Sequence, residues 1–296
     1  MMKSLQERFS GVFTALVTPF DEAGNLDLEA FESLVQYQLD AGVSGLVPVG
    51  TTGEAATLNE QERNQIIQRT VELSAGRAFV LAGTGSNDTA KAVAWSRKAE
   101  ELGADGCLVV TPYYNKPSQK GLLLYFETIA ASTNLPIILY SVPGRCAVEI
   151  APETAAELFD KHDNIVGIKE AGGSVERVNA LRKACGKDLI IHSGDDALTL
   201  PFLTCGAIGV TSVVSNLMPE LMIELFNAWN EGKSSVALNI HDRVCDLAAA
   251  MFIEGSPVPV KTALAMRGRM RDTVRSPLTQ LSAENTKYVR EILAVN

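Results

Sequence analysis

A lysine and a tyrosine, each placed near the end of a short apolar segment, could together carry out imine chemistry. Lys169 ends the run IVGIK (165–169), whose other residues are typical of a buried parallel strand. An amine held away from water loses part of its preference for the charged form, and the neutral amine can attack a keto group. Tyr140, near the end of IILYSV (137–142), carries a phenol that can move the protons such a reaction needs. The structural alternatives are a strand-end lysine paired with Glu170 and a tyrosine of the core.

Two further groups at strand ends could hold carboxylates. Thr51 and Thr52 lie in GTTGE (50–54), where the freedom of glycine lets backbone N–H groups and hydroxyls converge on an anion. The same segment is also compatible with a tight turn that places Glu54 near a helix start. Arg145 ends the tripeptide PGR, which follows the apolar segment IILYSV (137–142). A guanidinium there suits bidentate capture of a second carboxylate, and the alternative is an ordinary surface arginine.

Asp195 and Asp196 form an acidic pair after the seventh apolar segment. The pair is predicted to cap a helix and not to bind a metal, because no histidine or third carboxylate is spaced to complete a metal site.

These groups follow a regular order of short β-branched segments and longer amphipathic ones. Eight β-then-α units favour a (β/α)8 barrel over an open doubly wound sheet, and no GxGxxG follows the first strand. In such barrels the active site lies at the C-terminal ends of the strands. Pro48 is placed near the end of its strand, because a central strand disfavours proline. The predicted strands are 13–18, 45–50, 79–85, 107–112, 137–142, 165–169, 189–194 and 208–213.

Several predicted helices have start or stop signals in the sequence. Asn59, with Glu62 three residues later, predicts the start of a helix that stops at Gly76. Pro152 and Pro219 stand where a first helical residue is expected. After about residue 232 the strand pattern stops, and helices are predicted over 234–253, 261–270 and 283–294, separated by GSPVPV. The chain is therefore expected to comprise a barrel domain, 1–232, and a C-terminal helical appendage, 233–296.

Composition excludes several classes of function. The chain has 296 residues, 46% of them hydrophobic, which suffices for a large core. A net charge of −9 argues against nucleic-acid binding. Five scattered cysteines with no CxxC argue against a disulfide framework and a zinc site. No apolar run approaches a membrane span, and MMKSLQERFS lacks the apolar core of a signal peptide, so a soluble cytoplasmic protein is expected.

Five motifs in order along the chain resemble the dihydrodipicolinate synthase family of the N-acetylneuraminate lyase superfamily. The motifs are GTTGEAATL, TPYYNKPSQ, LYSVPGR, IVGIKEA and SGDDALTL, and the resemblance extends through PVPVK to nearly the whole chain. It implies a (β/α)8 barrel with a C-terminal helical domain, usually assembled as a homotetramer that is a dimer of dimers. The implied reaction is the condensation of pyruvate with L-aspartate-4-semialdehyde in lysine and diaminopimelate biosynthesis, with no metal or organic cofactor.

The resemblance also assigns roles to individual residues. Lys169 is the imine-forming lysine and Tyr140 the general acid/base, with Thr51 and Tyr114 as its relay partners. Tyr114 comes from the neighbouring subunit. Substrate binding is assigned to a set of four residues: Thr52 and Thr211 for pyruvate, Arg145 for the semialdehyde, and Gly194. Thr211 stands where relatives often carry isoleucine, Ser141 where asparagine is usual, and Cys146-Ala147 where Thr-Gly is frequent.

Two further expectations follow from the resemblance. Feedback-inhibited relatives bind L-lysine with a glutamate at the start of their third helix and with histidines early in the second. The matching positions here are Lys91, Glu60 and Arg63, so inhibition by L-lysine is expected to be weak or absent, although Asn87 and Tyr113 are retained. The alternative activity is another pyruvate aldolase, cleaving N-acetylneuraminate or a 2-keto-3-deoxy sugar acid; Arg145 speaks against it. A non-catalytic barrel that binds or assembles with other molecules is the third reading.

Overall fold

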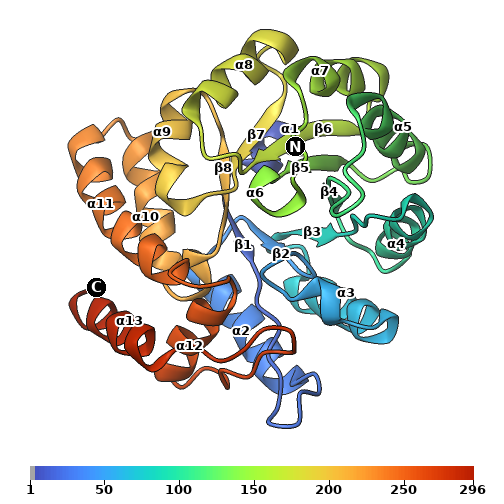
Figure 1. Cartoon of the computed structure of the whole chain (residues 1–296). Coiled ribbons are helices and arrows are strands. Elements are labelled where there is room, and N and C mark those ends of the chain that lie inside the picture. Colours follow the sequence, from blue (N-terminus) through green and yellow to red (C-terminus); the bar gives the residue numbers. More distant parts are fainter. Residues whose placement is uncertain (1–3) are drawn as a thin grey trace.

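The computed structural model describes residues 4–296 and contains a closed barrel of eight parallel strands, as predicted (Figure 1). Neighbouring strands pair in sequence order, and β1 pairs with β8 to close the ring. The strands are β1 (Gly11–Ala15), β2 (Gly45–Val47), β3 (Phe79–Gly83), β4 (Gly106–Val110), β5 (Ile137–Ser141), β6 (Ile165–Glu170), β7 (Ile190–Ser193) and β8 (Gly209–Ser212).

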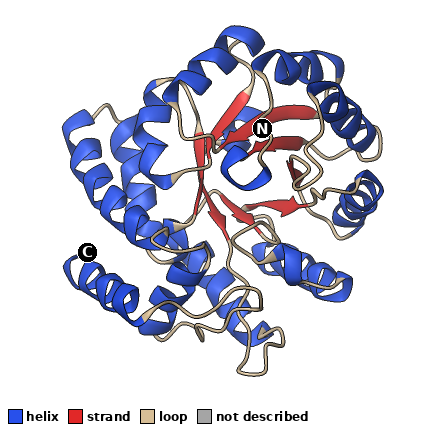
Figure 2. Ribbon diagram, viewed as in Figure 1, coloured by secondary structure: helices blue, strands red, loops and turns tan. Residues whose placement is uncertain are grey.

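Helices surround the barrel on the outside, and the strands form its centre (Figure 2). After α1 (Leu5–Phe9), the chain forms α2 (Leu28–Ala41), η1 (Ala55–Thr57), α3 (Glu60–Ser74), α4 (Thr89–Glu101), α5 (Gln119–Ala130), α6 (Pro143–Cys146), α7 (Pro152–Lys161), α8 (Val175–Cys185), η2 (Asp196–Leu198), α9 (Thr199–Thr204), η3 (Val214–Asn216) and α10 (Pro219–Asn230). Three helices follow the barrel: α11 (Ser234–Met251), α12 (Val258–Met266) and α13 (Ala283–Val295).

The helix starts predicted from Asn59, Pro152 and Pro219 are confirmed. Asn59 caps α3 by accepting from the backbone N–H of Glu62, and the Glu62 carboxylate accepts from the N–H of Asn59. Pro152 and Pro219 are the first residues of α7 and α10. The predicted start of the second C-terminal helix was wrong, because α12 begins at Val258 and not at 261. A proline in the first turn needs no N–H partner, so the Pro-rich segment can join the helix.

Strand β2 is shorter than predicted. It ends at Val47, directly before Pro48, and Val49 then takes the left-handed conformation with φ 59°. Proline therefore lies outside the ladder, where its missing N–H costs no strand hydrogen bond.

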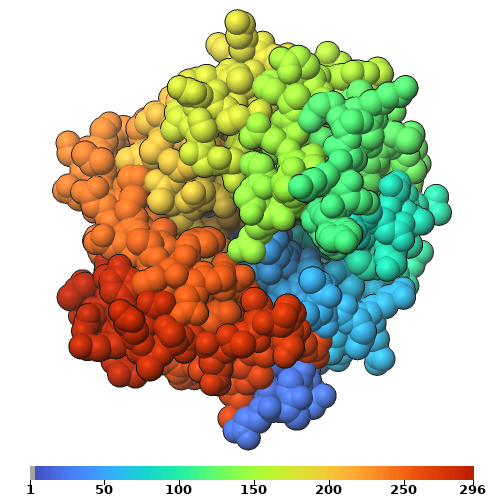
Figure 3. Space-filling model, in the orientation of Figure 1, coloured from blue at the N-terminus to red at the C-terminus, as the bar shows by residue number. Residues whose placement is uncertain are grey.

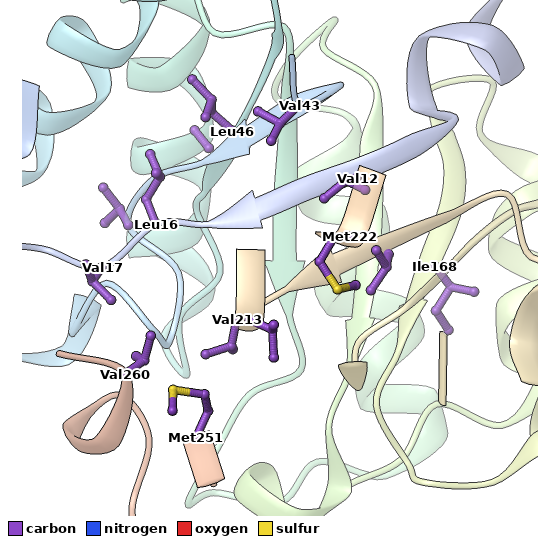
Figure 4. Packing of buried hydrophobic residues seen from close by; sticks show 14 of the residues in the cluster. Val12, Leu16, Val17, Val43, Leu46, Ile168, Val213, Met222, Met251 and Val260 are labelled. Atoms are coloured by element: carbon purple, nitrogen blue, oxygen red, sulfur yellow. The ribbon is translucent and has the colours of Figure 1, made fainter. Parts of the chain in front are cut away.

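Alternating side chains divide the apolar core into two parts. Outward-facing residues of the strands pack against the helices. Figure 4 shows residues of this outer core, with Val12 from β1, Met222 from α10 and Met251 from α11. Inward-facing residues fill the barrel, including Phe13 and Phe79.

Helix α1 closes the N-terminal end of the barrel. Its last residue, Phe9, is fully buried, and its ring lies 4.4 Å from that of Phe79 and 5.8 Å from that of Phe13 (centroid distances). The backbone oxygen of Phe9 is 2.7 Å from Nε2 of His192 on β7. The open end of the barrel is consequently the C-terminal one, where the strands present their polar residues.

A register shift between β5 and β6 decides which way β6 side chains point. Ile137 pairs with Ile165, but Ile138 pairs with Gly167, so β6 contains one extra residue. Val166 faces the barrel interior, whereas Ile168 faces the helices. With strict alternation of side chains, Val166 and Ile168 would both face inward and Lys169 would face outward. The extra residue in β6 reverses the alternation after Val166, so Lys169 faces the interior of the barrel.

Candidate active site

A cavity of about 600 Å³ lies at the C-terminal ends of the strands. Five residues predicted for the site line it: Lys169, Tyr140, Thr51, Thr52 and Arg145. The C-terminal part of the chain completes the rim with Ser256, Pro257, Pro277 and Leu278. On the face shown in Figure 3, yellow-green atoms of the α6 region lie at the centre, between blue atoms that follow β2 and orange-red atoms of the C-terminal segment.

Lys169 is buried at the base of this cavity. Its Nζ lies 4.2 Å from the centre of the Tyr140 ring. Burial lowers the pKa of the Lys169 amine from 10.5 to about 7; Asp196 opposes this shift and Arg145 adds to it. At neutral pH a large fraction of the amine is therefore unprotonated and able to act as a nucleophile.

The alternative pairing of Lys169 with Glu170 is contradicted by the structure. The Glu170 carboxylate, fully buried, accepts from the backbone N–H of Gly172 at 2.6 Å and from Nη2 of Arg177 at 3.1 Å. Glu170 points away from the barrel and ties the end of β6 to α8. The Lys169 amine is left without a carboxylate within ion-pair distance among residues 4–296.

Tyr140 is the neighbour of Lys169 in the sheet, because the two residues pair across β5 and β6. Burial raises the pKa of the Tyr140 phenol to about 12, against the opposing effects of Arg145 and of a hydrogen bond with Thr51. The phenol is protonated at neutral pH and can donate a proton, which Thr51 is placed to exchange with it.

The turn after β2 holds the two threonines at the cavity. The N–H groups of Gly53 and Ala55 donate to the Gly50 carbonyl, and the Thr18 hydroxyl donates to the Gly53 carbonyl. The backbone N–H groups of Thr51 and Thr52 have no acceptor in the part of the chain that the structure describes. They are available, with the two hydroxyls, to a carboxylate in the cavity.

Gly194 lies against the lysine stem. A Cβ on Gly194 would come within 3.0 Å of Lys169 Cε and 2.6 Å of Ala171 Cβ. Glycine at this position therefore leaves the space that the lysine side chain occupies.

Arg145 belongs to the short helix α6 and is exposed at the cavity rim. Of the replacements noted beside it, Ser141 and Cys146 are buried, whereas Ala147 is exposed. Cys146 lines the cavity, and burial raises the pKa of its thiol. The Ser141 hydroxyl accepts from the backbone N–H of Ile150 at 3.3 Å. Neither replacement removes the arginine from the rim.

Besides Gly194, which touches the lysine stem without lining the cavity, two predicted site residues, Thr211 and Tyr114, do not line the cavity of this chain. The hydroxyl of Thr211 is buried inside the barrel, 3.2 Å from Nδ1 of His192, and Thr211 does not line the cavity. Tyr114 lies on the surface with 91% of its area exposed and φ 74°.

Sequence reasoning missed a buried ion pair behind the threonine turn. Lys261 of α12 is fully buried, and its Nζ donates to Glu54 Oε1 at 2.6 Å and to the Thr18 carbonyl at 2.9 Å. The second Glu54 oxygen accepts from the backbone N–H of Arg275 at 3.0 Å. The sequence signal for this ion pair was Lys261 itself, the one charged residue in the otherwise largely apolar segment VPVKTALAM, because a lysine in such a segment normally needs a partner.

The acidic pair Asp195-Asp196 after β7 accepts hydrogen bonds from the backbone. Asp195 caps η2 by accepting from the N–H of Ala197. The buried Asp196 carboxylate accepts from the Ser212 hydroxyl and from the N–H groups of Val213 and Val214. Residues 4–296 contain no group of three or more His, Cys, Asp or Glu side chains arranged to hold a metal ion. No helix in the same range is both long and apolar enough to cross a membrane.

Fold and cavity together define a class: a (β/α)8-barrel enzyme with a poorly solvated lysine at its C-terminal mouth. Sequence comparison then identifies the group within that class. The model of the Dihydrodipicolinate synthetase family matches residues 8–296, and the chain belongs to that family.

Named relatives agree with this assignment. A 4-hydroxy-tetrahydrodipicolinate synthase from Thermodesulfovibrio yellowstonii is 47% identical over 285 residues, covering 96% of this chain and 97% of the relative. The solved synthase from Methylacidiphilum fumariolicum SolV has a TM-score of 0.95 and 47% identity, over 97% of this chain and 95% of that one. A dihydrodipicolinate synthase from Acinetobacter baumannii, solved in complex with pyruvate, has a TM-score of 0.94 and 38% identity, over 97% of this chain and 98% of that one.

Proposed function

We propose that this protein is a lyase that condenses pyruvate with L-aspartate-4-semialdehyde to 4-hydroxy-tetrahydrodipicolinate, through an imine on Lys169. The observation that carries the proposal is a lysine whose pKa is lowered to about 7, facing a protonated tyrosine in a cavity that also presents Arg145. Relatives at 44–47% identity are named for this reaction and not for sugar-acid cleavage. Their names therefore favour the condensation over the alternative aldolase activity.

The first half of the reaction uses the lysine and the tyrosine. The neutral Lys169 amine attacks C2 of pyruvate while Thr51, Thr52 and their N–H groups hold the carboxylate. Tyr140 supplies the proton with which the carbinolamine oxygen leaves as water, and Thr51 relays proton exchange with the phenol. The product is a protonated imine, which draws electrons from the adjacent methyl group.

The second half joins the two substrates. Loss of a methyl proton gives an enamine, whose carbon attacks the aldehyde carbon of the semialdehyde and forms the new C–C bond. Arg145 at the rim is suited to bind the semialdehyde's carboxylate by two parallel hydrogen bonds. The semialdehyde's amino group then displaces Lys169 from the imine carbon and closes the ring, which frees the enzyme.

Assembly belongs to the same proposal. The high exposure of Tyr114 supports its insertion into the mouth of a neighbouring subunit, where it would complete the proton relay with Thr51 and Tyr140. We propose a homotetramer built as a dimer of dimers, located in the cytoplasm. Each chain would divide at about residue 232 into a barrel domain and a helical domain.

Trapping with borohydride tests the imine directly. Incubation with pyruvate and borohydride is expected to add one three-carbon unit per chain, and peptide mass spectrometry should locate it at Lys169. Lys169→Arg should abolish labelling, because a guanidinium stays protonated. Lys91→Arg, which changes another lysine of the same cavity, is the matched control and should label fully. Labelling at any other lysine would exclude the proposed mechanism, and cleavage of N-acetylneuraminate at a comparable rate would favour the alternative activity.

A further inference from the structure

The chain between α12 and α13 returns to the catalytic mouth. We call residues 267–278 of this connection the C-terminal strap. The strap contacts α2 first, where Cζ of Arg269 lies 3.4 Å from the centre of the Tyr37 ring. It then reaches the mouth, where Pro277 and Leu278 line the cavity. Part of the cavity wall therefore comes from a segment that is distant in sequence from the strands.

Arg275 lies two residues before this part of the wall and connects the strap to two segments of the barrel. Its Nε donates to the carbonyl of Gly24, in the loop after β1, at 2.9 Å. Its Nη1 donates to the carbonyl of Thr57, the last residue of η1, at 2.9 Å. The guanidinium also lies over Phe20, with Cζ 4.2 Å from the ring centre. These contacts fix the plane of the guanidinium against the barrel.

The same guanidinium forms a bidentate ion pair with Glu62 at the start of α3. Nη1 and Nη2 lie 2.8 and 2.5 Å from the two carboxylate oxygens. The hydrogen bonds from Arg275 hold the pKa of the Glu62 carboxyl below its usual range. Most of each side chain is buried, with 19% of Arg275 and 16% of Glu62 exposed. A pair with two parallel hydrogen bonds is directional, so it sets the distance between the strap and α3.

The turn that carries Thr51 and Thr52 depends on contacts from outside itself. It is bounded by Val49 and Glu54, whose φ angles are 59° and 53°. Residues other than glycine rarely adopt this left-handed conformation, which persists where the surrounding structure imposes it. The backbone N–H of Glu54 donates to the Thr51 carbonyl at 3.0 Å, so the position of Glu54 is coupled to that of Thr51.

The C-terminal part of the chain supplies these outside contacts. One carboxylate oxygen of Glu54 accepts from Lys261, and the other accepts from the backbone N–H of Arg275. The N–H of Thr57 donates to the Glu54 carbonyl, and the Thr57 carbonyl accepts from the Arg275 side chain. The backbone that follows the threonine turn is therefore held at residue 54 and again at residue 57.

We propose that Arg275 is a positioning residue for pyruvate, which holds the Thr51–Thr52 turn in the conformation that presents its hydroxyls and N–H groups to the substrate carboxylate. This inference rests on the proposed function, because that function assigns the turn to pyruvate. Arg275 does not line the cavity, so its effect on pyruvate is transmitted through the turn.

The test compares pyruvate saturation with semialdehyde saturation in Arg275→Gln. This change removes the guanidinium and keeps the backbone N–H that donates to Glu54. The pyruvate concentration that gives half-maximal borohydride trapping at Lys169 should rise about fivefold or more, while the maximal rate stays within about twofold. The Michaelis constant for the semialdehyde should stay unchanged, which is the opposite of the pattern expected for Arg145→Ala.

Two further variants sharpen the comparison. Arg271→Gln is the matched control, because Arg271 lies in the same strap and pairs with Glu22 at the surface, with 54% of its side chain exposed. It should leave both saturation constants unchanged. In Glu62→Gln, the glutamine can still complete the capping box with Asn59 but offers Arg275 no charge. Half-saturating pyruvate should rise about two- to threefold in this variant, with no change for the semialdehyde.

A purely structural role for Arg275 predicts a different result. It would lower the urea midpoint and the amount of labelled protein, and it would leave half-saturating pyruvate unchanged in the folded fraction. That result, or an equal rise in Arg271→Gln, would overturn the inference. If Arg275→Gln does not fold, unchanged pyruvate saturation in Glu62→Gln overturns it. Absence of labelling at Lys169 in the unmodified protein would overturn the proposed function as well, so the two failures are distinguishable.

Discussion

Replacing Lys261 by methionine should destabilise the protein strongly, although this residue does not line the cavity. Its ammonium makes two hydrogen bonds, to Glu54 Oε1 at 2.6 Å and to the Thr18 carbonyl at 2.9 Å, and both Lys261 and Glu54 are screened from solvent. Hydrogen bonds to charged groups contribute about 1.5–3 kcal/mol each. Removing one partner of a buried pair costs about 3–5 kcal/mol, because the other charge is left uncompensated.

The measurement is the urea midpoint of unfolding, followed by circular dichroism at one protein concentration. A loss of about 3–5 kcal/mol is a large part of a typical stability of about 5–15 kcal/mol. Lys287→Met is the matched control: the Lys287 side chain is 78% exposed and its Nζ lies 3.8 Å from Glu291 Oε1, so the change should stay within about 0.5 kcal/mol. The Michaelis constant for pyruvate should rise in Lys261→Met, because Glu54 anchors the turn that carries Thr52.

A double variant separates lost charge from lost packing. In Glu54→Gln with Lys261→Met, the glutamine oxygen can still accept from the Arg275 N–H, and no buried charge remains unpaired. The double variant should therefore be more stable than Lys261→Met alone. If the two were equally unstable, or if Lys261→Met unfolded at the wild-type midpoint, the reasoning from the buried ion pair would be refuted.

Three further predictions concern the reaction and its control. The rate of imine trapping should rise about tenfold between pH 6 and pH 8, because the neutral fraction of Lys169 grows as pH rises through a pKa of about 7; a rise centred near 10 in stopped-flow assays would show an unperturbed amine. Arg145→Ala should raise the Michaelis constant for the semialdehyde far more than that for pyruvate, because about 1.5–3 kcal/mol of binding free energy to the semialdehyde is lost. An equal rise of both Michaelis constants in steady-state kinetics would indicate a structural role for Arg145. L-Lysine should inhibit weakly or not at all, because Lys91 and the buried Arg63 repel a cation; two like charges near 4 Å cost about 4 kcal/mol at an effective dielectric of 20. Strong inhibition below millimolar L-lysine, with matching heat of binding in calorimetry, would contradict this.

Local patterns predicted most of the frame. The order of the eight strands, the helix starts at Asn59, Pro152 and Pro219, and the placing of Lys169 at a strand end all follow from periodicity and from residues with specific backbone preferences. Boundaries were less accurate where proline was read as a separator. Helix α12 takes in Pro259, because the first turn of a helix tolerates a missing N–H.

The sequence by itself determined which residues lie at the mouth of the barrel. The tertiary structure decided which groups surround each of these residues. Lys169 points inward because β6 carries an extra residue relative to β5, and the register of two strands depends on both of them. Glu54 meets Lys261 across 207 residues, and neither local segment reveals the other. The Tyr140 and Lys169 pKa values move in opposite directions because the closed barrel removes both side chains from water. Desolvation depends on everything packed around a group, and the neighbours of a residue along the chain are only a small part of that surrounding.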